Sequence, residues 1–285
     1  MASFLGFRVP DCGDFHLHTR LSDGMLPPER LVAEARSRGL THIAVTDHDT
    51  LAGVAAARAE GRRLGVAVIP GVEMSTRYRG REVHLLGFGL DPGDRAVAER
   101  FERFRAARWT RIERMIGKLT DLGLAVTVAD VRRELLDASS LPCRPHLARA
   151  LQRAGAVATA EESFARYIGD DGPAYVGIED GFETLEAIRF VRDHAGIAVV
   201  AHPHASGVVE HLPALAAAGL DGVECHHPDH AAAGTRELLR FCRAAGLVAT
   251  GGSDAHGEHD VGRVRMDGPE IAATLARIEE RGGLI

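Results

Sequence analysis

The sequence predicts an α/β fold, either a parallel sheet or a (β/α) barrel, interrupted by an inserted helical segment. Short apolar, β-branched strands alternate with Ala-rich helices before residue 94 and again after residue 181, which is the pattern of βαβ units. Between these stretches one long helical pattern and several shorter ones replace the alternation. His, Asp and Glu residues also follow strand after strand, and functional residues of such folds lie at the carboxyl ends of the strands.

The first stretch contains the most regular alternation. Pro27 and Pro28 open a helix, because proline is tolerated in the first turn. Gly39 and Gly65 end the two helices, as glycine commonly does at a helix carboxyl end. The expected elements are strand 14–18, helix 27–38, strand 41–46, helix 51–64, strand 66–70 continuing into 71–76, a turn at 79–80 and strand 82–90.

The insert follows the linker Asp91-Pro92-Gly93-Asp94. Apolar residues recur at helical spacing from 95 to 121, and residues 126 to about 178 read as shorter helices broken by prolines and a glycine. The expected division is therefore a first barrel part at 1–93, an inserted helical, substrate-binding domain at 94–177 and a second barrel part at 178–285.

The second stretch resumes the alternation. The expected elements are helix 182–194, strand 197–201, helix 209–218, strand 222–225, helix 234–245, strand 247–250 and helix 268–281. Strands and helices of these lengths, with polar residues directly after each strand, again favour βαβ units.

Composition excludes several classes of protein. Of 285 residues, 45% are hydrophobic and 26% charged, as in an ordinary globular enzyme, and the net charge of −6 gives no overall case for nucleic-acid or membrane binding. No apolar run approaches the roughly 20 residues of a membrane helix. The four cysteines form no CxxC pair, which argues against a thiolate metal site and a disulfide framework and fits a reducing cytoplasm. Nothing in the sequence indicates an obligatory protein partner.

The long helix is locally basic, and two interpretations stay open. Its cations could attract a nucleic-acid backbone, or they could form a solvated face with Glu–Arg pairs, which we favour. The cations are Arg100, Arg103, Arg105, Arg108, Arg111, Arg114 and Lys118.

A metal centre is the function that the strand ends predict. His16 and His18 are two residues apart on one strand, so their side chains share a face. Sulfur-free sets of imidazole and carboxylate suit Mn²⁺, Zn²⁺ or Fe²⁺ better than Mg²⁺. At three to four ligands per ion, the set implies two or three ions, with Glu73 able to bridge a pair. The candidate ligands are His16, His18, Asp23, His48, Glu73, His84, His202, Asp254 and His256.

The same residues lie in motifs that resemble those of the PHP (polymerase and histidinol phosphatase) family. The motifs are His16-Leu17-His18 with Ser22-Asp23-Gly24, Thr46-Asp47-His48-Asp49-Thr50, Pro70-Gly71-Val72-Glu73, Glu82-Val83-His84, Ala201-His202-Pro203 and Gly252-Ser253-Asp254-Ala255-His256. The insert segment Cys143-Arg144-Pro145-His146-Leu147-Ala148-Arg149 is similar to the RPHFAR-type segment of TrpH/YciV-like members. The resemblance covers nearly the whole chain and implies a distorted (β/α)7 TIM-like barrel with a trinuclear metal site.

The resemblance also implies a distribution of ligands. Three ions per chain are expected, with Mn²⁺ favoured over Zn²⁺ or Fe²⁺. His16, His18, Glu73 and Asp254 would hold the first ion, Glu73, His84 and His202 the second, and Asp23, His48 and His256 the third. Glu73, Asp254 and His202 are thus also the expected catalytic residues, and a hydroxide bridging the ions is the expected nucleophile. Asp47 and Asp49 are expected to orient histidine ligands, with capping of the following helix as the alternative for both.

Substrate binding is assigned to cations outside the metal centre. Arg144 can grip a phosphate bidentately and His146 can donate to it, with His230 as a further contact. The resemblance implies a metal-dependent phosphoesterase acting on a nucleotide or short oligonucleotide. The expected reactions are removal of the 3′-phosphate from 3′,5′-bisphosphonucleotides and 5′→3′ trimming of short 5′-phosphorylated oligonucleotides. The alternatives are a histidinol-phosphate phosphatase and a non-catalytic structural PHP module.

Overall fold

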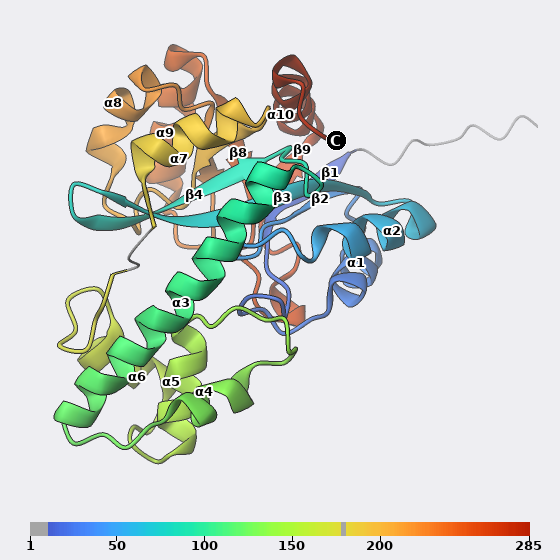
Figure 1. The fold of residues 1–285 in the computed structure, drawn as a ribbon. Coiled ribbons are helices and arrows are strands. Elements are labelled where there is room, and N and C mark those ends of the chain that lie inside the picture. Colours follow the sequence, from blue (N-terminus) through green and yellow to red (C-terminus); the bar gives the residue numbers. More distant parts are fainter. Residues whose placement is uncertain (1–10, 178–180) are drawn as a thin grey trace, which may run out of the picture.

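A nine-stranded sheet curls into a nearly closed barrel in the computed structural model, which describes residues 11–177 and 181–285 (Figure 1). The strands run in the order β8-β7-β6-β4-β3-β2-β1-β9, with β5 paired to β3. Their bounds are β1 (Cys12–Leu17), β2 (His42–Val45), β3 (Ala67–Tyr78), β4 (Arg81–Phe88), β5 (Phe182–Glu183), β6 (Ile197–Val200), β7 (Gly222–His226), β8 (Val248–Gly251) and β9 (Met266–Asp267).

Two features make this the expected distorted barrel. A parallel bridge between Leu17 and Ala255 joins the end of β1 to the segment after β8, and this contact closes the ring of strands. Strand β4 is antiparallel to both β3 and β6. It follows β3 through a tight turn in which Arg79 and Gly80 have φ of 51° and 83°, so a hairpin replaces one helical crossover. The predicted fold class is confirmed.

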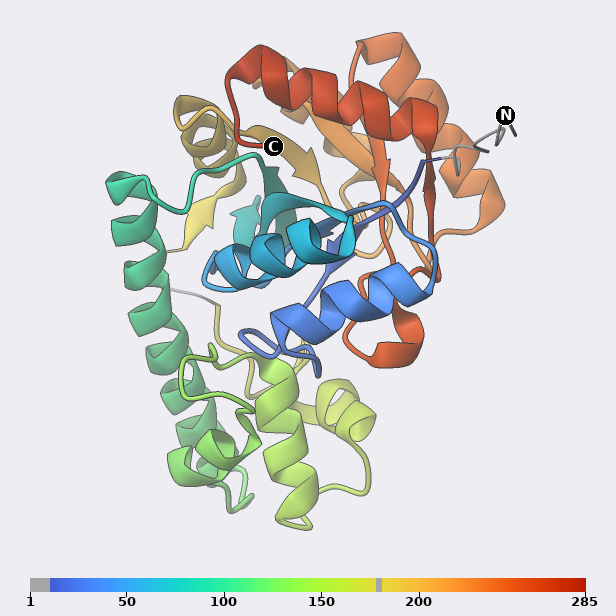
Figure 2. The same ribbon diagram turned by 90° about the vertical axis from the view of Figure 1, so that its right-hand side faces the viewer.

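Helices cover the outside of the barrel (Figure 2). They are α1 (Pro28–Ser37), α2 (Val54–Leu64), α7 (Thr184–Asp193), α8 (Leu212–Ala217), α9 (Ala232–Ala245) and α10 (Gly268–Arg281). As expected, Gly39 and Gly65 close α1 and α2 in the left-handed conformation. Helix α7 begins later than predicted, because Phe182 and Glu183 pair with β3 first. Strand β9, which the sequence did not indicate, adds two residues antiparallel to β1.

One long helix connects the insert to the barrel (Figure 2). Its helices are α3 (Arg95–Asp121), α4 (Val128–Glu134), α5 (Arg144–Arg153) and α6 (Ala160–Ser163), followed by a π-helical turn at Phe164–Ile168. The first turns of α3 bury Phe101 and Phe104 in the barrel core, whereas Ile112 and Met115 belong to a separate apolar cluster with α4 and α5. Helix α3 thus connects two cores. The boundary at 93/94 stays a prediction, and the one at 178 lies outside the described residues.

None of the helices in the described part of the chain is long and apolar enough to cross a membrane.

Two cations of α3, Arg108 and Arg111, are buried rather than solvated. The expected solvated face is therefore wrong at these two positions, since both side chains point into the junction between insert and barrel.

Candidate metal centre

The two histidines of β1 point at two carboxylates from other strands. His16 Nε2 lies 3.4 Å from Glu73 Oε2 and 3.5 Å from Asp254 Oδ1. His18 Nε2 lies 3.3 Å and 3.0 Å from the same two oxygens. Glu73 comes from the middle of β3 and Asp254 from the segment after β8, so barrel closure brings the four together. They form one geometrically suitable group, which has the composition expected for the first ion.

A second group lies on the other side of His18. Asp23 Oδ1 is 3.3 Å from His256 Nε2, and Asp23 Oδ2 is 3.7 Å from His48 Nε2. His18 Nδ1 is 3.7 Å from Asp23 Oδ1 and completes the group. The expected trio is thus assembled, and one ring nitrogen of His18 faces each group. Because an imidazole normally serves one ion, His18 stays assigned to the first group by its shorter contacts.

The third group differs in one member from the expectation. His84 Nδ1 lies 2.7 Å and His202 Nε2 3.1 Å from Glu73 Oε1. His48 Nδ1 lies 3.1 Å from Glu73 Oε2. Among the described residues, the atoms that come close enough to share an ion are those of His48, Glu73 and His84. His202 contacts the same carboxylate but stands outside that group, so its role as a ligand stays a prediction.

Glu73 is the centre of the arrangement. Its side chain is 1% exposed and five histidines surround its two oxygens. Burial opposes ionisation of Glu73, but the neighbouring histidines hold its pKa well below the ordinary value. Conversely, burial opposes protonation of His18 and His84, yet contacts to carboxylates raise the pKa of each to about 10. A cation bound here would replace these protons as the positive charge that balances the carboxylates.

The donor atoms fit a divalent ion. Four of them are buried and have no hydrogen-bond partner in the described part of the protein: His16 Nε2, His18 Nε2, His48 Nδ1 and Asp23 Oδ1. Buried polar atoms without a partner are rare in folded proteins, and a missing ion is one of the accepted explanations. Imidazole nitrogens with carboxylate oxygens, and no sulfur, are the donor set of Mn²⁺, Zn²⁺ or Fe²⁺.

Asp47 supports the loop that carries Asp23. Its Oδ1 accepts from Thr19 N at 2.7 Å and from Ser22 Oγ at 2.6 Å, and its Oδ2 accepts from Thr19 Oγ1 at 2.7 Å. It makes no hydrogen bond to a histidine in the described structure. The expectation that Asp47 orients a histidine is therefore wrong, and it acts on a carboxylate-bearing loop instead.

Asp49 serves neither of its expected roles. Helix α2 begins at Val54, after Gly53, so Asp49 does not cap it. Instead, Asp49 Oδ2 accepts from Arg108 Nε at 2.8 Å, and Asp49 Oδ1 accepts from Ser75 N at 2.9 Å. This buried pair ties helix α3 of the insert to the barrel next to the metal centre.

Arg144 reaches the metal centre from the first turn of α5. Its guanidinium lies 3.3 Å from Glu82 Oε1 and 2.5 Å from Asp170 Oδ1. It lines two adjoining cavities of about 180 Å³ each. One is also lined by the candidate ligands Asp23, His48, His84 and His256, and the other by His84 and His202. The structure therefore brings Arg144 and the predicted ligands to one place.

His146 and His230 are oriented by backbone contacts. The His146 Nδ1 atom accepts from Cys143 N at 3.0 Å, so a neutral ring carries its proton on Nε2. Burial lowers the pKa of His146 to about 4, which keeps the ring neutral at pH 7. His230 Nδ1 lies 3.0 Å from the Cys225 carbonyl oxygen and must donate to it. Neither histidine lines the two cavities, so their binding roles stay predictions.

Sequence reasoning missed two residues from β7 and its end. Glu224 is fully buried and its Oε1 lies 2.9 Å from His16 Nδ1. His227 is buried with Nε2 3.5 Å from Asp254 Oδ2. The available signal for Glu224 was an acidic residue inside an otherwise apolar strand, since a buried carboxylate requires a partner.

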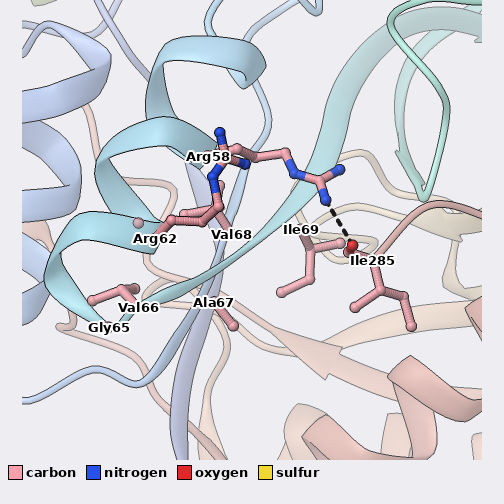
Figure 3. Close-up of a pocket in the computed structure, with 9 residues that line it drawn as sticks. Arg58, Arg62, Gly65, Val66, Ala67, Val68, Ile69 and Ile285 are labelled. Carbon is pink, nitrogen blue, oxygen red and sulfur yellow. Dashed lines mark hydrogen bonds between the residues drawn. The ribbon is translucent and has the colours of Figure 1, made fainter.

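Another cavity, of about 380 Å³, lies beside the start of β3 (Figure 3). Helix α2 and the amino-terminal end of β3 line it, and Arg58 donates to the Ile285 carbonyl oxygen at 2.7 Å across its rim. None of the nine candidate ligands lines this cavity. Five of the candidate ligands line the smaller cavities beside Arg144 instead.

Comparison with known proteins places this geometry in a family. A family model described as the PHP domain matches residues 14–140. A phosphoribosyl 1,2-cyclic phosphate 1,2-diphosphodiesterase from Eggerthella lenta is 36% identical over 91% of this chain and 99% of its own length. A 3′,5′-nucleoside bisphosphate phosphatase from Chromobacterium violaceum is 32% identical over 93% and 95%. A 5′-3′ exoribonuclease from Haemophilus influenzae is 31% identical over 85% and 89%.

A solved structure agrees with these relatives. The crystal structure of a protein classed as a metal-dependent phosphoesterase, from Bifidobacterium adolescentis, superposes with a TM-score of 0.85 at 32% identity and covers 93% of this chain and 96% of that one. Six of the nine candidate ligands lie in the segment that the family model matches, and the likeness to the relatives spans nearly the whole chain. The chain belongs to the PHP domain family.

Proposed function

We propose that this protein is a metal-dependent hydrolase that cleaves phosphate esters of nucleotides carrying a second phosphate. The observation that carries the proposal is the junction of a clustered His/carboxylate centre with a guanidinium, that of Arg144, on shared cavities. Both a bisphosphonucleotide and a phosphoribosyl cyclic phosphate, on which the relatives are named to act, carry two phosphoryl groups. Removal of the 3′-phosphate from 3′,5′-bisphosphonucleotides is the reaction we favour, with trimming of short 5′-phosphorylated oligonucleotides as a linked activity.

We propose that the nine candidate ligands hold three divalent ions, Mn²⁺ in preference to Zn²⁺ or Fe²⁺. Such ions lower the pKa of bound water and neutralise charge on a phosphoryl group. Glu73, Asp254 and His202 are the proposed catalytic residues, which is supported by their contacts within the same cluster of histidines and carboxylates. Glu73 is buried, so its contacts with the histidines are shielded from water and are stronger than they would be at the surface.

The insert would supply the second phosphate site. Arg144 offers two guanidinium nitrogens, a geometry that matches a phosphate. The neutral His146 ring, with its proton on Nε2, can donate without repelling Arg144. His230 presents an acceptor when neutral, because its Nδ1 donates to the backbone. It is therefore better suited to a hydroxyl group of the substrate than to a phosphate.

The free thiols of Cys12, Cys143, Cys225 and Cys242 support a reducing compartment such as the cytoplasm.

The test uses Mn²⁺ and measures phosphate release from adenosine 3′,5′-bisphosphate, phosphoribosyl 1,2-cyclic phosphate and histidinol phosphate, and mononucleotide release from a short 5′-phosphorylated RNA. Arg144→Ala should lower kcat/KM for the two-phosphate substrate about 10- to 100-fold, the loss expected for charge-assisted hydrogen bonds. Arg133→Ala is the control, since Arg133 lies on α4 of the same insert, is 66% exposed and pairs with the partly exposed Asp130. Turnover of histidinol phosphate alone, indifferent to Arg144, would leave the metal centre standing and refute the substrate assignment. A chain that binds ions but turns over no phosphate ester would favour the structural alternative.

A further inference from the structure

Glu224 connects two of the candidate ligands through a single carboxylate. It lies in the middle of β7, between the core residues Val223 and Cys225, and is completely buried. Its Oε1 lies 2.9 Å from His16 Nδ1. Its Oε2 accepts from the backbone N–H of His202 at 2.8 Å. One side chain thus ties the first strand of the barrel to the turn that follows β6.

The contact with His16 determines which ring nitrogen is available to an ion. An ionised carboxylate can only accept a hydrogen bond, so His16 must carry a proton on Nδ1. In the neutral ring, this leaves the Nε2 lone pair free, and Nε2 points at Glu73 Oε2 and Asp254 Oδ1. A ligating histidine is commonly held in this way, with its second nitrogen donating to a carboxylate.

The contact with His202 acts on the backbone. His202 has φ of 28°, and a non-glycine residue in this left-handed region is strained unless its surroundings hold it there. The hydrogen bond from its N–H to Glu224 is such a restraint. In this conformation, the His202 ring reaches Glu73 Oε1 at 3.1 Å.

We propose that Glu224 is a positioning residue of the metal centre, which selects the ion-binding tautomer of His16 and holds the strained turn at His202. The proposal rests on the metal-dependent function proposed above. It extends that function by assigning a role to a residue that touches neither ion nor substrate. The role requires a carboxylate, because both neighbours of Glu224 present N–H groups to it.

This requirement makes Glu224→Gln a discriminating variant, because glutamine has nearly the same shape but presents a donor on one side. If its NH₂ faces His202 N–H, two donors oppose each other in a buried place. If its NH₂ faces His16, the ring must accept at Nδ1 and carry its proton on Nε2, which then cannot ligate. In neither orientation does the glutamine accept hydrogen bonds from both His16 Nδ1 and His202 N, as the carboxylate does.

The matched control is Glu270→Gln. Glu270 Oε1 lies 2.7 Å from Nε2 of His226, which is also on β7 but is not a candidate ligand. Both variants are loaded with Mn²⁺ alone by titration calorimetry, and their bound metal is counted after dialysis. Glu224→Gln should lose affinity for at least one ion by about 10- to 100-fold, as for other groups that orient a ligand, whereas Glu270→Gln should match the wild type.

A second measurement does not depend on the variant folding. In the wild-type protein loaded with diamagnetic Zn²⁺, nitrogen-15 NMR should show His16 protonated on Nδ1. A proton on Nε2 would overturn the proposal, as would wild-type Mn²⁺ affinity in a folded Glu224→Gln variant. Wild-type protein that binds neither ion would instead refute the proposed function, so the two failures are distinguishable.

Discussion

Replacing Arg108 with methionine should both destabilise the protein and loosen the segment that carries Arg144. Arg108 and Asp49 are 4% and 0% exposed, and the guanidinium lies 2.8 Å (Nε) and 2.7 Å (Nη2) from Asp49 Oδ2. Burial opposes the charge on Arg108, but the neighbouring Asp49 carboxylate still raises its pKa above the ordinary value. Methionine keeps much of the apolar stem and removes the charge, which leaves the Asp49 carboxylate buried without its partner.

The magnitude follows from that uncompensated charge. Removing one partner of a buried ion pair costs about 3–5 kcal/mol. Asp49 keeps one hydrogen bond, from Ser75 N, so the lower end of this range is expected, about 3 kcal/mol. With a urea m-value of roughly 3 kcal/mol per molar for a chain of this size, the unfolding midpoint should fall by about 1 M.

The effect should extend to substrate binding. Arg108 Nη1 also contacts Cys143 Sγ at 3.2 Å and the Pro142 carbonyl oxygen at 3.4 Å, immediately before Arg144. Losing these contacts should raise KM for a two-phosphate substrate more than it lowers kcat, because the metal ligands themselves remain in place.

The assay is urea unfolding of metal-free protein followed by circular dichroism, with steady-state kinetics of the loaded enzyme. Arg95→Met on the same helix is the control, since Arg95 is 91% exposed and pairs only with Glu99 among the described residues. Its midpoint should be nearly that of the wild type. A double variant, Asp49→Asn with Arg108→Met, should recover part of the loss, because no buried charge is then left unpaired. An Arg108→Met midpoint equal to that of the control would refute the reasoning.

Three further changes test other parts of the structure. The folded pKa of His146 is about 4, below the ordinary 6.5, so its stabilisation is complete above pH 6.5 and is lost as the pH falls toward 4. Between pH 6.5 and 5 this group lowers the free energy of unfolding by about 1.6 kcal/mol. His146→Asn should remove that loss, measured by urea unfolding at the two pH values, and an unchanged pH dependence would contradict this. Asp170 is 61% exposed and competes for Arg144, so Asp170→Asn should lower KM for a bisphosphonucleotide about 2- to 5-fold at unchanged kcat, and a higher KM would count against it. Chelation should lower the thermal midpoint and added Mn²⁺ should restore it, because an ion that binds only the folded chain stabilises it; an indifferent midpoint would argue against bound ions.

Many elements could be predicted because their signals are local. The bounds expected for the long helix at 95–121 and the last helix at 268–281 coincide with α3 and α10. Apolar periodicity, glycine at helix ends and a proline in the first turn act within a few residues of one another, so no knowledge of the fold is needed to interpret them. The late start of α7 was not predictable in this way, because it depends on pairing of Phe182 with Thr76 of β3.

In the candidate site, too, only the features that depend on local sequence could be predicted. Nine polar residues at successive strand ends predicted a cluster, since parallel strands present their carboxyl ends at one edge, and the structure assembles eight of them in suitable groups. The contacts of Glu224 with His16 and the pairing of Asp49 with Arg108 involve residues far apart in the chain. Sequence spacing carries no information about such contacts.

The sequence by itself determined the alternation of strands and helices and the chemical character of the strand ends, because side-chain period and residue type are properties of short segments. Only the tertiary structure decided that five histidines surround Glu73, that Glu82 and Asp170 hold Arg144, and that Glu224 joins His16 to His202. Those arrangements arise when the barrel closes and the insert packs against it. Burial then leaves each of these polar groups dependent on a partner that another part of the chain supplies.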